Sequence, residues 1–207
     1  MQKSFFYVTM ALVLFVMASC GSDSSSPTEP NPPTAAELCA TGWTQFESDN
    51  FTGSASSFQE AITTDSDYCE AYIGLAITRL RQDNFTDAKT QLTTAKTKSP
   101  TTNQSIAISL GLSFVYVKEN NATGIITELS GKITGTDTFD IGYGTGIDAV
   151  DIHTLLGEAY IMQRTLGTEG GSAMNALDAW GQVKKAIALD GSDAKANELQ
   201  EYLRGTR

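Results

Sequence analysis

Apolar and polar positions along the chain repeat with a fixed period. The tetrapeptide Asp-Asn-Phe-Thr at residues 49–52 recurs at residues 83–86, a shift of 34 residues. The same shift pairs side chains of like character at other positions: Leu38 with Tyr72, Gly42 with Ala76, Phe58 with Leu92, and Ala61 with Ala95. A repeat of this length accommodates two helices joined by a turn. The pattern therefore predicts helical hairpins stacked one on another, beginning near residue 35.

The second copy of the repeat has the sharpest pattern of large and small side chains. Its two helices are marked by Tyr72, Leu75, Ala76, Phe85, Ala88, Leu92 and Ala95, and Pro100 ends the copy. The alanines are expected where the helices approach closely, and the large side chains are expected to fill the space between them. This arrangement resembles the tetratricopeptide repeat (TPR) family. The resemblance implies an all-α, TPR-like helical-repeat solenoid.

The remaining units are weaker copies of this pattern. A third helix pair is expected over residues 106–118 and 122–131, and a fourth over residues 153–160 and 179–186. A last helix begins near Asp193 and has an apolar face of Ala196, Leu199 and Leu203. Its opposite face is polar, as the end of a solenoid requires. The fold expected for residues 35–204 is therefore about four helix pairs plus a C-terminal capping helix, with a loop inserted near 132–147.

The N-terminal residues have the features of an export signal. Lys3 precedes an apolar stretch at residues 5–17 that is short for a membrane span and ends in small residues before Cys20. Residues 17–20, Met-Ala-Ser-Cys, resemble the bacterial lipobox. The resemblance implies a lipoprotein signal peptide at residues 1–19, and diacylglycerol and palmitate on Cys20. An ordinary secretory signal is the alternative interpretation.

A Ser- and Pro-rich segment follows the cysteine, and we expect residues 20–34 to form a flexible tether. In enterobacterial lipoproteins the residue after the lipidated cysteine decides which membrane retains the protein, and the residue at this position here is Gly21. That resemblance implies a bacterial outer-membrane lipoprotein whose helical domain faces the periplasm or the outside. The partners expected are the membrane, through the lipid, and an envelope protein or peptide.

Composition narrows the range of functions. The formal net charge of −10 argues against nucleic-acid binding, which needs a basic face. His153 is the single histidine and falls at an inward helix position, which disfavours histidine-based catalysis and zinc chemistry. The loop aspartates Asp137, Asp140 and Asp148 do not follow the EF-hand spacing. We therefore expect a non-enzyme with no catalytic residues, no cofactor and no metal.

The TPR resemblance also implies a binding surface. In that family the first helix of each pair lines a concave groove, and the corresponding positions here are Trp43, Phe46, Glu47, Ile73, Ile77, Leu80, Arg81, Leu112 and Tyr116. These side chains would form an apolar groove with charged margins, suited to a peptide segment. The alternative is a closed groove, which burial of both Trp43 and Phe46 would indicate.

Two cysteines remain after Cys20. The repeat register places Cys39 and Cys69 on first helices of neighbouring units, and an exported protein meets an oxidising environment. They can be joined by a disulfide, or they can be two buried thiols that pack as small apolar side chains.

The function expected from these features is that of a membrane-anchored, non-catalytic interaction scaffold or adaptor in the bacterial cell envelope. It would bind partner segments through the concave groove. The alternative is a lipoprotein that binds a small ligand or peptide with the groove and the loop at residues 132–147. A deep pocket with convergent polar groups would favour that alternative.

Overall fold

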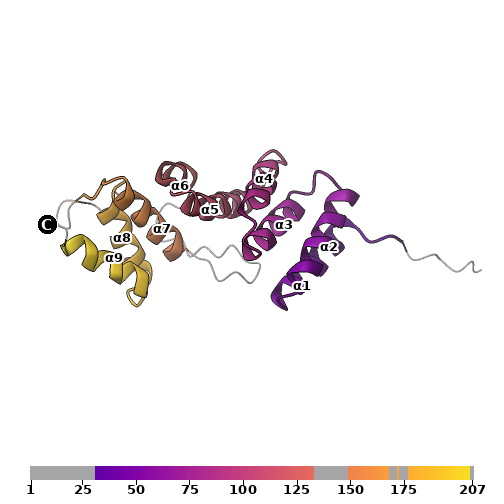
Figure 1. Ribbon diagram of the computed structural model, residues 1–207, viewed down its shortest axis with the longest axis horizontal. Coiled ribbons are helices and arrows are strands. Elements are labelled where there is room, and N and C mark those ends of the chain that lie inside the picture. The colour runs from indigo at the N-terminus through magenta and orange to yellow at the C-terminus, as the bar shows by residue number, and fades with distance from the viewer. Residues whose placement is uncertain (1–30, 133–148, 168–171, 173–176, 206–207) are drawn as a thin grey trace, which may run out of the picture. The chain divides into compact units, whose positions relative to one another are not determined.

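The computed structural model describes residues 31–132, 149–167, 172 and 177–205 (Figure 1). Within these ranges the chain forms nine α-helices and no strand. The helices are α1 (Ala35–Glu47), α2 (Phe51–Thr64), α3 (Cys69–Arg81), α4 (Phe85–Ala95), α5 (Thr102–Lys118), α6 (Ala122–Leu129), α7 (Ala149–Met162), α8 (Ala179–Leu189) and α9 (Ala194–Gly205). All of them belong to one unit, Pro33–Arg207.

Several predictions of the sequence lie outside the described residues. They are the signal peptide at residues 1–19, the lipidated Cys20, most of the tether at residues 20–34, and the inserted loop apart from residue 132. None of the described helices combines the length and the hydropathy that a membrane span needs.

The helices pack as consecutive pairs. Helix α1 packs against α2, α3 against α4, α5 against α6, and α7 against α8, while α9 contacts both members of the last pair. Neighbouring pairs meet where the second helix of one contacts the first helix of the next, as Figure 1 shows for α2 and α3. The first helices α1, α3 and α5 also contact one another in series. The prediction of four helix pairs plus a terminal helix is confirmed.

The 34-residue period is visible in the helix boundaries. Helices α3 and α4 begin 34 residues after α1 and α2, respectively. The turns inside the first three pairs share one device, in which an asparagine caps the second helix. The side chains of Asn50, Asn84 and Asn121 accept hydrogen bonds from backbone N–H groups three residues later, at 3.1, 3.2 and 2.9 Å. Each cap follows a residue with φ between 54° and 58°, which reverses the chain direction.

The third pair begins earlier than the sequence pattern indicated. Helix α5 starts at Thr102 instead of residue 106, because Thr101 and Gln104 form a reciprocal capping box ahead of the first large apolar residue. Its partner α6 is short and ends at Leu129, two residues before the expected end. The small Gly111 of α5 faces Leu92 of the preceding pair.

The first two pairs are held together by one fully buried aromatic side chain. Phe58 on α2 lies against Gly42 on α1 and Gly74 on α3. A β-carbon at Gly42 would lie 2.8 Å from the ring of Phe58, and a β-carbon at Gly74 would overlap that ring. One repeat later, Ala76 stands at the position of Gly42 and Leu92 at the position of Phe58. The small residue is therefore larger there, and the large residue is smaller.

Candidate interaction cleft at α3, α4 and α5

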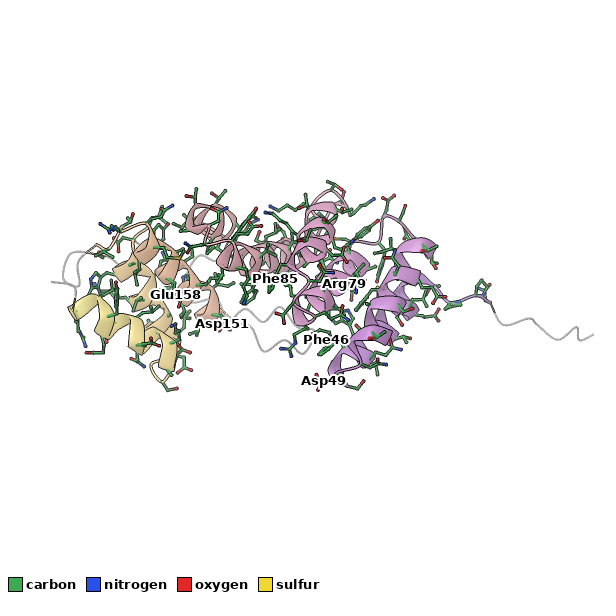
Figure 2. All side chains as sticks on the ribbon, in the orientation of Figure 1. Phe46, Asp49, Arg79, Phe85, Asp151 and Glu158 are labelled. Atoms are coloured by element: carbon green, nitrogen blue, oxygen red, sulfur yellow. The ribbon has the colours of Figure 1, made fainter. Side chains whose placement is uncertain are left out.

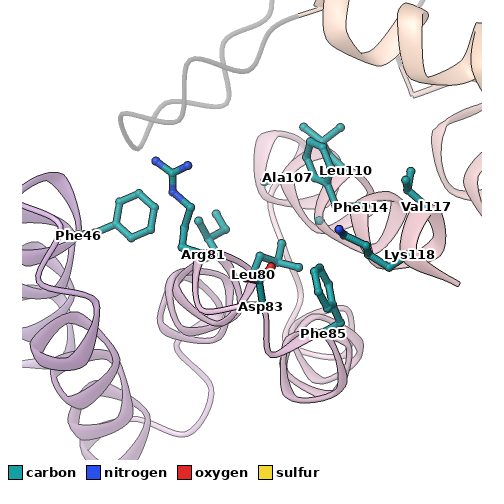
Figure 3. Close-up of a pocket in the computed structure, with 12 residues that line it drawn as sticks. Phe46, Leu80, Arg81, Asp83, Phe85, Ala107, Leu110, Phe114, Val117 and Lys118 are labelled. Atoms are coloured by element: carbon teal, nitrogen blue, oxygen red, sulfur yellow. The ribbon is translucent and has the colours of Figure 1, made fainter.

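A cleft of about 330 Å³ opens where α3 ends, α4 begins and α5 passes beside them (Figure 3). Its surface is largely apolar and comes from sequence-distant helices. The apolar lining residues are Phe46, Ile77, Leu80, Phe85, Ala107, Leu110, Gly111, Phe114 and Val117, and the charged ones are Arg81, Asp83 and Lys118. A volume of this size is at the lower end of what protein-bound ligands and anchor side chains occupy.

The exposed apolar surface of the cleft comes chiefly from α5. Phe114 is 37% exposed and Val117 is 42% exposed. Helix α5 carries apolar side chains around its whole circumference: Ile106, Ile108, Leu110 and Val115 are buried, while Phe114 and Val117 remain facing solvent. A helix that is apolar all round normally has both faces covered. The cleft is therefore the place where α5 lacks a partner among the described residues.

Four of the nine predicted groove residues line this cleft. Ile77 and Leu80 are half-buried and line it, Arg81 is exposed at its margin, and Phe46 contributes one edge although it is only 4% exposed (Figure 3). Glu47 is exposed but does not line the cleft. Because Trp43 and Phe46 are both buried, the structure has the closed form of the predicted groove, and only its end at Ile77, Leu80 and Arg81 opens into the cleft.

Other predicted groove residues are buried, which corrects the expectation of a groove running along α1. Trp43, Ile73 and Leu112 are all part of the packed interior. The ring of Trp43 lies 4.9 Å from that of Phe58, centroid to centroid. Its indole N–H donates to a carboxylate oxygen of Glu70 on α3 at 3.0 Å. Helices α1 and α3 are therefore in direct contact here and leave no room between them.

Tyr116 is also placed away from the cleft. Its half-buried ring lies against α6, where a β-carbon on Gly124 would come within 2.8 Å of it. The Lys89 ammonium lies 4.9 Å from the centre of this ring and also pairs with Glu119 at 2.7 Å. Tyr116 therefore helps to join α4, α5 and α6.

The structure adds residues to the site that the sequence did not single out. Phe85 was expected in the interior of its helix pair, but it is half-exposed at the cleft, on a different helix from Phe46 (Figure 2). Phe114, Val117 and Lys118 lie on the last turns of α5. The signal that could have identified them is the excess of apolar residues in α5 over the single stripe that packing requires.

Two cations at the cleft rest on aromatic rings. The guanidinium carbon of Arg81 lies 5.7 Å from the ring centre of Phe46 and 5.9 Å from that of Phe51. The ammonium of Lys118 lies 5.3 Å from the ring centre of Phe85. Neither cation forms an ion pair with a described residue. Contacts of this kind position a charge while leaving its hydrogen-bonding capacity open.

Cys39 and Cys69 are both free, buried thiols. The predicted alternative of a disulfide is therefore not what the structure has. Cys39 packs in the apolar cluster of α1 to α3, whereas Cys69 packs in the cluster that continues through the later helices. Burial raises the pKa of the Cys39 thiol to about 12, and the nearby Glu70 carboxylate adds to the shift. Such thiols are poor nucleophiles at neutral pH.

His153 lies in the interior of the α7–α8 pair, as expected for a packed histidine. Its Nδ1 lies 2.8 Å from the side-chain oxygen of Gln182, so Nδ1–H donates to that oxygen. Burial lowers the pKa of His153, and the nearby Lys185 ammonium contributes in the same direction. No group of three or more metal-ligating side chains occurs among the described residues.

Comparison with protein-family models and with curated proteins finds no match. Solved structures do match in fold. A chain from the crystal structure of the APC/C hetero-tetramer Cut9–Hcn1 superposes with a TM-score of 0.62 at 13% identity, over 82% of this chain and 30% of that one. YrrB, described as a TPR protein with an unusual peptide-binding site, gives a TM-score of 0.47 at 14% identity, over 81% of this chain and 92% of that one.

These comparisons bear on the fold alone. The chain spans less than a third of the length of the Cut9–Hcn1 chain that it matches. Both neighbours are TPR-repeat proteins, and the likeness to the first of them, together with the paired helices, shows a TPR-like helical-repeat solenoid.

Proposed function

We propose that this protein is a lipid-anchored, non-catalytic scaffold of the bacterial cell envelope that binds a segment of a partner protein in the cleft at α3, α4 and α5. The observation that carries the binding role is the exposure of Phe114 and Val117 beside half-buried Phe85. Apolar side chains gathered in a concavity with a charged rim are typical of protein-binding surfaces. The TPR-like fold of the chain supports the same role.

The anchoring role depends on the N-terminal sequence. Cys20 ends a lipobox-like tetrapeptide, and a Ser- and Pro-rich segment separates it from the first helix at Ala35. A tether of this composition lets a lipid anchor hold the helical domain near a membrane without fixing its orientation. In this arrangement the scaffold acts by raising the local concentration of its partner at the membrane.

Binding of a small ligand is the second candidate, favoured by the cleft volume of about 330 Å³. The polar groups of the cleft argue for a protein partner instead. Arg81, Asp83 and Lys118 are the charged lining residues, and the cleft between them is open and apolar. A ligand pocket normally directs polar groups at a bound molecule from several sides.

The binding role can be tested by site-specific photo-crosslinking in living cells. A photoreactive phenylalanine is placed at residue 114 in the cleft or, as the matched control, at residue 202. Tyr202 is 54% exposed on α9 and lies outside the cleft. We expect a discrete crosslinked protein from position 114 that is lost when Val117→Asp is added. The same crosslinks from both positions would contradict the proposal.

The anchoring role has a separate test. Cells expressing the full chain are fed an alkyne-tagged palmitate, and the protein is examined for label. We expect labelling of the wild type and none of Cys20→Ser, which should also leave the membrane fraction. Cys39→Ser is the matched control, because that thiol is buried in the helical domain. Labelling that persists in Cys20→Ser would overturn the anchoring assignment.

A further inference from the structure

The charges around the cleft differ from those of the chain as a whole. The formal net charge of the chain is −10, yet the cleft is lined by two cations, Arg81 and Lys118, and one carboxylate, Asp83. An excess of positive charge at one concave site on an acidic protein attracts acidic groups locally.

The two cleft cations also differ from their immediate neighbours. Arg79, two residues before Arg81, forms an ion pair with Asp87 at 2.7 Å. Lys89, one α4 turn beyond Phe85, pairs with Glu119 at 2.7 Å. Arg81 and Lys118 have no such partner among the described residues, although each is held in place by an aromatic ring.

The location of these cations relates them to the apolar surface of the cleft. Arg81 ends α3 and Lys118 ends α5, and the exposed side chains of Phe114 and Val117 lie on α5 within the turn before Lys118 (Figure 3). An occupant that covers Phe114 and Val117 therefore comes within reach of Lys118. Covering these apolar side chains also removes water from around the charges, which strengthens any pairing with them.

We propose that the segment bound in the cleft is acidic as well as apolar: a bulky aliphatic or aromatic side chain covers Phe114 and Val117, and neighbouring Asp or Glu carboxylates pair with Arg81 and Lys118. This inference rests on the proposed function, because it specifies the chemistry of the partner segment. It disfavours basic segments, which would meet two cations and only one carboxylate, that of Asp83, among the charged lining residues. Phe46 and Phe85 would keep the cations oriented before binding, which lowers the entropy cost of pairing.

A selection of random 12-residue peptides tests the inference. Peptides displayed on phage are selected on the full chain in detergent and counter-selected on the Phe114→Asp/Val117→Asp variant. We expect the enriched peptides to carry Asp or Glu within a few positions of Leu, Ile, Phe or Met. Synthetic versions should bind the wild type, and binding should weaken as salt is raised from 50 to 500 mM, because exposed ion pairs are screened.

Charge reversal then assigns the carboxylate contacts. Arg81→Glu and Lys118→Glu should each weaken binding of the selected peptides about tenfold, as expected for loss of a partly desolvated charge pair. Lys132→Glu is the matched control: Lys132 is exposed, bonds to Ser105 at 3.0 Å, and does not line the cleft. It should leave binding unchanged. Peptides with Lys in place of Asp or Glu should bind Arg81→Glu better than the wild type.

The outcomes separate the inference from the function on which it rests. Peptides that depend on the cleft but lack acidic residues, or that bind equally to the charge-reversed variants, would overturn the inference and leave the binding role standing. Failure to enrich any peptide that prefers the wild type over Phe114→Asp/Val117→Asp would overturn both. Unchanged far-ultraviolet circular dichroism of the variants, all at exposed positions, shows that folding is retained.

Discussion

The first two helix pairs and the last one are built differently, although both are antiparallel hairpins. In α1 to α4 three residues connect the helices of each pair, and an asparagine cap sets the start of the second helix. In the α7–α8 pair the connection runs from residue 163 to residue 178. Its ends are tied by backbone bonds, from Ala179 N–H to Thr165 O and from Trp180 N–H to Leu166 O.

The hydrogen bonding of buried polar side chains also differs between these helix pairs. The buried hydroxyls of Ser54 and Thr78 bond to each other at 3.0 Å, and Thr78 also donates to the carbonyl of Gly74. The α7–α8 interior contains the Nε2 atom of His153 and the hydroxyl of Thr154, and neither has a hydrogen-bond partner among the residues that the structure describes. A short repeated turn fixes helix register locally. In the α7–α8 pair the start of the second helix is fixed instead by the two backbone bonds at the ends of the connection and by the Asp178 side chain, which accepts from the N–H of Gly181.

The largest loss of stability is expected when the buried ring of Phe58 is removed from the first two helix pairs. Phe58→Ala should lower the free energy of unfolding by about 3–5 kcal/mol, because the side chain is fully buried between two helices and its glycine neighbours cannot fill the space. Val183→Ala, the matched change in the last pair, should cost about 2 kcal/mol, since fewer atoms are removed. Chemical denaturation followed by circular dichroism measures both. Equal losses would contradict the comparison.

Filling the glycine contacts should have the next largest effect. Gly74→Ala should destabilise by roughly 2 kcal/mol, because the new β-carbon overlaps the ring of Phe58 and outweighs the gain in helix propensity. Gly157→Ala should be nearly neutral, because the gain in helix propensity is offset by a tight contact of 3.1 Å between the new β-carbon and a methyl of Val183. Gly205→Ala has no neighbour within 4 Å and serves as the control. Melting temperatures of the three variants test this ranking.

The burial of His153 in the α7–α8 pair predicts that the stability of the protein depends on pH. Because burial holds the pKa of His153 below its ordinary value of 6.5, the unfolded chain binds a proton near that pH that the folded chain does not. Stability should therefore be complete above pH 6.5 and fall below it, with a slope of at most about 1.4 kcal/mol per pH unit from this group.

His153→Gln provides the control for this dependence, since it keeps a side chain able to donate to Gln182 but does not titrate. The difference in unfolding free energy between wild type and variant is measured from pH 7.5 to pH 5.5. We expect the wild type to lose more stability than the variant across this range. Parallel curves would show that His153 does not control the acid sensitivity.

Ion pairs between the helix pairs should have the smallest effects. Lys96, the C-cap residue of α4, pairs with Glu128 on α6 at 2.6 Å, and the Glu128 side chain is only 12% exposed. Lys96→Ala should cost up to about 1 kcal/mol, and Lys89→Ala, whose partner Glu119 is 41% exposed, should cost less. Denaturation at low and high salt measures both, and a larger loss for Lys89→Ala would reverse the expected order.

The fold was largely predictable because its signals are local and repeated. The small residues Ala76, Ala88 and Ala95 are fully buried, as their spacing indicated. The turns were also correctly placed, since their polar residues recur with the period. The boundary of α5 was less accessible, because a capping box extends a helix beyond its apolar stripe.

The candidate site was predictable only in part. Periodicity identifies which face of a helix turns inward, but not how closely neighbouring pairs approach. Trp43 and Phe46 were expected on an open surface and are buried, because α1 and α3 are in contact. Phe85 shows the opposite displacement, from an expected interior position to the cleft. Such shifts arise from the tilt between pairs, which depends on contacts far apart in the sequence.

The asparagine caps have a consequence for producing the protein in other hosts. Asn50, Asn84 and Asn121 are each followed, two positions later, by threonine, so each cap is also an acceptor sequence for N-linked glycosylation. A eukaryotic secretory pathway would attach a bulky sugar to the very amide that starts a helix, inside a three-residue turn. Material secreted from such cells should be checked for glycans before its stability is compared with that of protein expressed without glycosylation.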